Sequence, residues 1–165
     1  MQTTIKNIKS LPLFPTPLSW PFRLLPSSVH NRLLVATLNK IFKQELKQGE
    51  LEFLQGKTLS ILIEDMRIEY RFTLNNKNLV TTDKNHSPDL ILQGTVYNYL
   101  LLASRREDTD TLFFNRRLRM QGDTELGLHV KNFLDGMDMD SHEIPAYFES
   151  VLQKSLPIYE HLFGK

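Results

Sequence analysis

Apolar and polar residues alternate with a period of two in the middle of the chain. Segment 59–63 has Leu or Ile at every second position, and segment 68–74 repeats this pattern with Ile, Tyr, Phe and Leu. Such alternation is typical of a strand that buries one face. The polar run 75–78 has the composition of a turn and leads to a short apolar segment at 79–82. We therefore predict three consecutive strands in an antiparallel meander.

Two further short segments are predicted as strands. Segment 90–92 is wholly apolar and ends at Gly94, which is typical of a more buried strand. Segment 118–121 alternates Leu and Met with Arg and Gln, and Gly122 ends it. We expect an aromatic turn at 112–114 to lead into this fifth strand.

Apolar residues three or four positions apart predict four helices, each with a start signal at its first residues. The first begins at Ser27 or Ser28 and continues unbroken to Gly49, and its apolar stripe is interpreted as core. Thr95 is expected to cap the second, and Asp123 or Thr124 the third, which ends at Gly136. Residues 145–162 form the last helix, with a kink near Pro157.

This order of elements predicts the α+β fold class, with a five-stranded, mainly antiparallel sheet covered by one layer of helices. The length of 165 residues fits one domain. We divide the chain into a Pro-rich, basic and apolar arm at 1–26, a domain at 27–140 and a C-terminal helix at 141–165.

Charge is distributed unevenly along the chain, although the net charge is only +1. The first 44 residues contain six basic side chains and no acidic one, whereas the remainder contains 14 basic and 19 acidic side chains. A nucleic-acid-binding protein would carry its positive charge on the folded body, so this class is not favoured. The apolar character of the basic segment indicates an anionic and apolar partner surface.

The N-terminal arm has the composition of a membrane-contacting segment. Five of the eight prolines fall within residues 12–26, so a long helix is excluded there. The arm has neither the pattern of a signal peptide nor an apolar run that could span a bilayer. Aromatic and basic side chains together suit the headgroup region of an anionic membrane. The alternative is an arm packed on its own domain or on a partner. The residues predicted to contact the membrane are Trp20, Phe22, Arg23, Leu24 and Leu25.

Residue patterns of the common catalytic and metal sites are not found. The chain has no cysteine, which excludes disulfides, thiolate metal sites and cysteine nucleophiles. The five histidines show no metal-binding spacing, and the sequence has no nucleophile elbow, P-loop or dinucleotide motif. Glu125 and His129, four residues apart, are interpreted as a surface contact, and the acidic run at 135–143 as a solvated linker. We therefore predict no catalytic residue, no metal and no cofactor.

One basic cluster lies in the body of the chain. It is interpreted either as a solvated face or, through Arg117 and Arg119 of the fifth strand, as a site for an anionic lipid headgroup. The cluster comprises Arg105, Arg106, Arg116, Arg117 and Arg119.

Two stretches of the sequence carry a more specific pattern. They are GELEFLQG at 49–56, just before the first strand, and DTDTLFFNRRLRMQGDTELGLHVKN at 108–132. These stretches resemble the sterol carrier protein 2 family of lipid-binding domains, and most closely its members that serve bacterial ubiquinone biosynthesis as accessory factors. The resemblance covers about residues 30–136.

The resemblance implies that the five-stranded sheet and its helices enclose an apolar tunnel for a lipid tail or a polyprenyl chain. It also implies a role in oxygen-independent ubiquinone biosynthesis beside prenyl-ring hydroxylases, in the cytoplasm and peripheral to the inner membrane. No catalytic residue follows from it.

The function expected is therefore a non-enzymatic carrier of a prenylated quinone precursor or phospholipid. An adaptor that assembles pathway enzymes without carrying lipid is the alternative, and a small hydrolase or isomerase is disfavoured by the missing motifs. The residues predicted to bind the lipid form an apolar set, although for each residue taken separately core packing is the favoured interpretation. They are Tyr97, Leu100, Leu101, Phe113, Phe114, Met120, Leu126, Val130, Phe133 and Met137.

Overall fold

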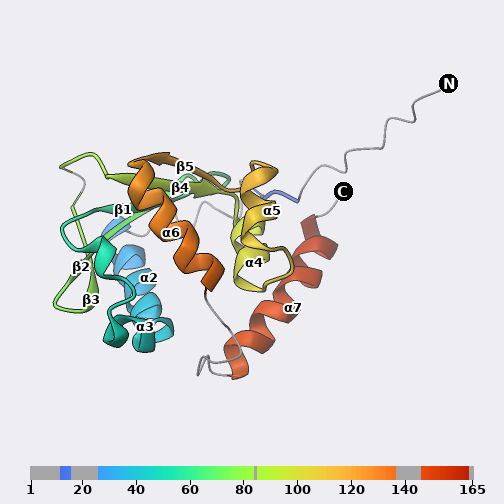
Figure 1. Cartoon of the computed structure of the whole chain (residues 1–165). Helices are drawn as coiled ribbons and strands as arrows, with labels where there is room; N and C mark the ends of the chain where they lie inside the picture. Colours follow the sequence, from blue (N-terminus) through green and yellow to red (C-terminus); the bar gives the residue numbers. More distant parts are fainter. Residues whose placement is uncertain (1–11, 16–25, 84, 137–145, 164–165) are drawn as a thin grey trace.

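A five-stranded sheet forms one layer of the computed structural model, which describes residues 12–15, 26–83, 85–136 and 146–163 (Figure 1). The strand order across the sheet is β3-β2-β1-β4-β5. The strands are β1 (Leu59–Ile63), β2 (Ile68–Asn75), β3 (Asn78–Thr81), β4 (Leu90–Gly94) and β5 (Arg119–Gly122). The helices are α2 (Ser27–Ile41), α3 (Lys43–Gln48), η1 (Glu52–Leu54), α4 (Val96–Ala103), α5 (Thr109–Phe114), α6 (Thr124–Gly136) and α7 (Ala146–Phe163).

The predicted meander is confirmed, since β1, β2 and β3 pair in antiparallel order. The fourth strand pairs with β1 in parallel, and β5 pairs with β4 antiparallel. The sheet is therefore mixed but mainly antiparallel, as predicted. The chain reaches the far side of β1 through the connection 82–89, which places β1 at the centre of the sheet.

The strand register places most of the apolar strand residues on one face, whereas Leu62, Val80 and Ile91 lie on the other. Leu59 lies opposite both Phe72 of β2 and Leu90 of β4, and the next residue on this face, Ile61, lies opposite Tyr70 and Leu92. The other face carries polar residues such as the Ser60, Glu69 and Arg71 group, in which Glu69 accepts hydrogen bonds from both other side chains. In the view of Figure 1, α2, α4 and α6 lie beneath the sheet.

Two local predictions are wrong. The first helix is not continuous to Gly49, because Phe42 has ψ of 26° and separates α2 from α3. Hydrogen bonds from Phe42 N–H to Leu38 and from Leu46 N–H to Phe42 continue on both sides, so the departure from helical geometry is confined to one residue. Gly49 does end α3, in the left-handed conformation with φ of 82°.

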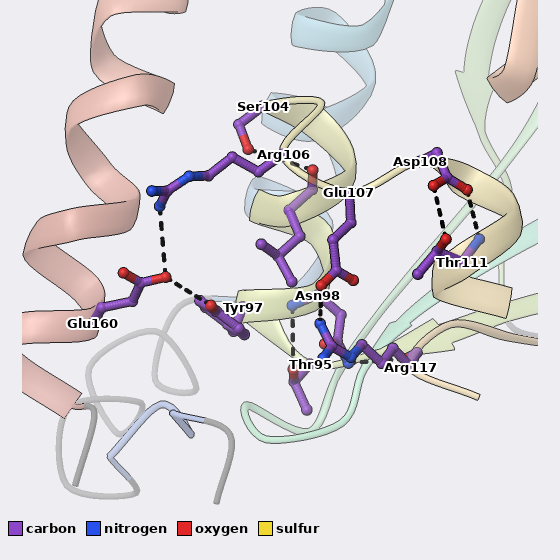
Figure 2. Close-up of polar contacts among 11 residues, drawn as sticks. Thr95, Tyr97, Asn98, Ser104, Arg106, Glu107, Asp108, Thr111, Arg117 and Glu160 are labelled. Carbon is purple, nitrogen blue, oxygen red and sulfur yellow. Dashed lines mark hydrogen bonds and ion pairs between the residues drawn. The ribbon is translucent and has the colours of Figure 1, made fainter. Parts of the chain in front are cut away.

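The segment 112–114 is also not a turn, because it forms the end of helix α5. Asp108 begins this helix, and its carboxylate accepts hydrogen bonds from the backbone N–H and the hydroxyl of Thr111, both at 2.7 Å (Figure 2). Leu112 is completely buried in the core. The capping aspartate compensates for the short length of the helix.

The predicted caps of the two central helices are confirmed. The Thr95 hydroxyl accepts from the backbone N–H of Asn98, and the Asp123 carboxylate accepts from those of Glu125 and Leu126, both at 3.0 Å. Hydrogen bonds from the backbone N–H of Leu126, from Lys57 and from the backbone N–H of Glu125 hold the pKa of Asp123 below its usual value.

Lys57 connects the beginnings of three elements. Its ammonium group lies 3.0 Å from the carboxylate of Asp123 at the start of α6 and 3.8 Å from that of Asp89, which precedes β4. Asp89 in turn accepts a hydrogen bond of 2.7 Å from the backbone N–H of Thr58, just before β1. These contacts align β1, β4 and α6 at one edge of the domain.

The C-terminal helix α7 packs on α4. Leu156 is completely buried and Tyr159 nearly so, and Phe14 from the N-terminal segment stacks against Tyr159. Figure 2 shows Glu160 of α7 accepting a hydrogen bond of 2.7 Å from the hydroxyl of Tyr97. Part of the N-terminal arm and the C-terminal helix thus share one core with α4.

We predict that Gly122→Ala lowers the free energy of unfolding by about 2–3 kcal/mol, because the backbone there has φ of 128° and a Cβ would lie 2.2 Å from the carbonyl oxygen of Asp89. Denaturation in urea measures this change. Gly136→Ala is the matched control, since no atom lies within 4 Å of the added Cβ, and it should leave stability nearly unchanged. Equal effects of the two substitutions would contradict the prediction.

A second prediction concerns the dependence of stability on pH. The pKa of Asp123 is lower in the folded state than the value of about 3.9 in an unfolded chain, so its charge stabilises the fold above that pH. This contribution is lost as the pH falls through the lowered pKa. Asp123→Asn keeps a capping oxygen without the charge. The stability advantage of the wild type over this variant, measured by urea denaturation, should therefore shrink between about pH 6 and pH 3. A difference independent of pH would disprove the effect.

Candidate functional site

An apolar cavity of about 330 Å³ lies between the sheet and the helices. Its walls come from α2, η1, β1, β2, β4, α4 and α6, with Leu79 of β3 beside them. Protein interiors are normally packed without voids of this size, and ligand pockets begin at about 300 Å³. The volume therefore marks this space as the candidate functional site.

The cavity exists because the helices do not fill the centre of the sheet. On the central strand β1, Leu59 is buried, whereas Ile61 and Ile63 are only half-buried although they lie on the same face. Two clusters of buried residues form on either side, one around Leu59 and Phe72 and the other around Leu101 and α7. Residues of both clusters, such as Phe72 of the first and Leu92 of the second, contribute to the cavity lining.

Three phenylalanines from different elements pack at the α6 side of the cavity. The rings of Phe42 and Phe133 meet edge to face with centroids 5.3 Å apart, and Phe53 lies 6.2 Å from Phe133. The outer side of Phe53 is stacked by His129 at 5.6 Å. The ring of His129 thus packs against an aromatic side chain of the cavity wall.

The lining contains no acidic, basic or imidazole side chain. Its polar atoms belong to Thr37, Tyr70 and Tyr99. The Thr37 hydroxyl donates to the carbonyl of Leu33, and the Tyr99 hydroxyl donates to the carbonyl of Leu92 at 2.8 Å. Burial raises the pKa of Tyr70 and of Tyr99, so both phenols are neutral at physiological pH. The site is suited to an uncharged apolar group.

Nine of the ten residues predicted to bind lipid lie among the described residues, and they do not share one environment. Val130 and Phe133 line the cavity. Leu126 is buried in the first core cluster, and Met120 contacts both clusters. Tyr97, Leu100, Leu101 and Phe113 belong to the cluster beneath α7. Phe114 is 89% exposed and lies outside the cavity, and Met137 lies outside the described residues.

The inner face of α2 was assigned to the core from the sequence, yet much of it lines the cavity. Leu34, Leu38 and Ile41 are half-buried and contribute to the wall, together with Phe42 just after the helix. Only Val35 is fully buried within this helix. A stripe of leucine and isoleucine is the same in sequence whether it meets side chains or an empty space, so no sequence signal could identify these residues.

The basic cluster of the body is largely paired with acidic residues. Arg117 lies 2.6 Å from Glu107 and Arg106 lies 3.6 Å from Glu160 (Figure 2). Arg119 contacts Glu64. These ion pairs fit the interpretation of a solvated face. None of the cluster residues lines the cavity.

Membrane and metal features are limited in the part of the chain that the structure describes. In residues 12–15, 26–83, 85–136 and 146–163, no helix is both long and apolar enough to cross a bilayer. Within the same residues, no three His, Asp or Glu side chains gather as they would around a metal ion. The predicted membrane contacts lie outside the described residues. They are Trp20, Phe22, Arg23, Leu24 and Leu25.

Comparisons with known proteins agree with this architecture. The sequence profile of the SCP-2 sterol transfer family matches residues 38–135. The ubiquinone biosynthesis accessory factor UbiT of Escherichia coli K12 is 40% identical over 128 residues, which cover 78% of this chain and 73% of that protein, and UbiT of E. coli O157:H7 gives the same values.

A solved structure described as UbiJ-SCP2 ubiquinone synthesis protein superimposes with a TM-score of 0.53. The match covers 66% of this chain and 95% of the other, at 14% sequence identity. At that identity the similarity concerns the fold.

Proposed function

Because the chain belongs to the SCP-2 sterol transfer family, we propose that it is a non-catalytic accessory factor of ubiquinone biosynthesis that binds a lipid in its apolar cavity. The observation that carries this proposal is the cavity of about 330 Å³ with an uncharged lining. Identity of 40% to UbiT supports the pathway.

The proposed ligand is a prenylated quinone precursor or a phospholipid. The cavity would hold the apolar tail of this ligand. Each methylene removed from water contributes about 0.8 kcal/mol, so even a short length of tail supplies useful affinity. The polar head of the ligand would remain outside the apolar lining, where prenyl-ring hydroxylases of an oxygen-independent pathway could reach it.

A carrier role is favoured over catalysis by the chemistry of the lining. General acid–base or nucleophilic catalysis needs a titratable or nucleophilic side chain beside the reacting atoms. The lining offers two neutral phenols and one hydroxyl, and those of Thr37 and Tyr99 are already bonded to backbone carbonyls.

The alternative is an adaptor that assembles pathway enzymes at the membrane without carrying lipid. Such a protein has no need of an internal volume, and close packing would fill it with side chains. The cavity therefore favours the carrier, and lipid recovery decides between the two.

We predict that native mass spectrometry and organic extraction of the purified protein recover about one lipid per chain. Leu38→Trp places a larger ring in the cavity and should reduce the recovered lipid by about tenfold, since a filled cavity holds no tail. Leu128→Trp is the matched control, because Leu128 is 57% exposed on α6, and it should retain the lipid.

If Leu38→Trp proves unstable in thermal melts, Ala103→Leu, which fills the same cavity from α4, provides the test. No lipid in the wild type, even after incubation with quinone precursors and liposomes, would support the adaptor instead.

We also propose that the arm contacts an anionic membrane through Trp20, Phe22, Arg23, Leu24 and Leu25. Trp20→Ala with Phe22→Ala should weaken co-sedimentation with anionic liposomes by about tenfold or more, because each ring buries substantial apolar area in the headgroup region. Phe114→Ala is the control, since it removes an exposed aromatic ring of the folded body. Unchanged binding of the arm variant would refute the assignment.

A further inference from the structure

One aromatic ring of the folded body is exposed to solvent. Phe114, the last residue of α5, is 89% exposed, although the burial of an aromatic side chain is strongly favourable. Its neighbour Phe113 packs against the second core cluster, so the two rings leave the helix on different sides.

A second exposed apolar side chain lies on the adjoining helix. Leu128 of α6 is 57% exposed and lies one turn before Lys131, whose ammonium group is 2.6 Å from the carboxylate of Asp110 on α5. Asp110 in turn lies one turn before Phe114. Residues one turn apart share a side of a helix, so both exposed apolar side chains lie beside the same ion pair.

The turn that follows α5 contains an arginine where glycine is favoured. Backbone hydrogen bonds run from Arg116 to Phe113 at 3.0 Å and from the next residue to Leu112 at 2.9 Å, which is the Schellman arrangement. Its left-handed position is taken by Arg116, with φ of 56°. Glycine adopts this conformation at lower cost, because it has no Cβ. The chain thus accepts a strained backbone at a position that displays an exposed guanidinium group.

The charge of Arg116 is not compensated. The other two arginines of this segment, Arg117 and Arg119, pair with glutamates, and the carboxylate of Asp110 is paired with α6. Arg116 has no ion pair with any residue that the structure describes. The charge left beside Phe114 is therefore a single unpaired cation.

We propose that Phe114 and Arg116 form a docking site for a protein partner whose surface offers an apolar pocket with a carboxylate at its rim. Aromatic and arginine side chains are enriched among the residues that dominate the free energy of protein–protein binding. An anionic bilayer or a nucleic acid is disfavoured, because such polyanions are bound by several unpaired cations, whereas this site has one. The proposal does not depend on the contents of the cavity, since neither residue lines it.

Two substitutions remove the site without disturbing the core. Arg116→Gly removes the guanidinium group and suits the left-handed backbone, so thermal melts should show unchanged or higher stability. Phe114→Ala removes only an exposed ring. Lys77→Gly is the matched control, because Lys77 is also an exposed cation with a left-handed φ of 60°. It lies in the turn between β2 and β3, at the opposite edge of the sheet.

Photochemical cross-linking identifies the partner. The photoreactive residue p-benzoylphenylalanine is placed at position 114 of the full-length protein in the cells that make it, and mass spectrometry locates the cross-linked peptide after irradiation. We expect cross-links to one protein, within a segment of net negative charge. The same photoreactive residue at position 77 should not give this product.

The affinity of the two purified proteins then tests the chemistry. Isothermal titration calorimetry should show that Kd rises by about tenfold or more in Arg116→Gly and in Phe114→Ala and is unchanged in Lys77→Gly. Arg116→Glu should abolish binding, and a lysine in place of the acidic residue in the cross-linked segment of the partner should restore it.

Four results would overturn the proposal. They are cross-links to phospholipid or nucleic acid alone, no cross-link at position 114, equal affinity of Arg116→Gly and Lys77→Gly, and a dimer of this chain that Phe114→Ala dissociates in sedimentation experiments. Lipid extraction from the same variants should match the wild type, so failure of the docking site leaves the proposed carrier function intact.

Discussion

The structure depends on how the apolar face of the five-stranded sheet is removed from water. Register places Leu59, Phe72 and Leu90 side by side, and this area cannot remain exposed without a large free-energy cost. The helices cover the face, but they pack tightly only at its two ends. Ile61 and Ile63 at the centre are therefore half-buried against an empty space. The cavity is a consequence of incomplete coverage, and the proposed function needs that space.

Helices that stand apart from a sheet must be held by contacts at their ends. For α6 this support is the Asp123 cap together with Lys57, and for α2 it is the pair of hydrogen bonds between Asn39 and Leu79. Helix α4 is fixed through Thr95 and through Tyr99, whose hydroxyl reaches the sheet backbone. Polar contacts at the rim thus replace the packing that the centre lacks.

Helices α2 and α7 have different roles in the domain. The inner face of α2 contributes part of the cavity wall. The C-terminal helix α7, by contrast, completes the core beneath α4 with the fully buried Leu156. Helix α2 therefore packs with the first core cluster and helix α7 with the second.

The sequence alone determined those features that depend on neighbours along the chain. Period-two alternation predicted three of the five strands, and short apolar runs predicted the other two. Short polar side chains predicted the caps at Thr95 and Asp123, and Gly122 marked a turn that only glycine adopts easily. The tertiary structure decided the parallel pairing of β1 with β4 and which leucines line the cavity. Leu38 beside a void and Leu90 in a packed core require the same residue type, because both must avoid water. Their difference arises only from the distance between elements, which is set by contacts far apart in the sequence.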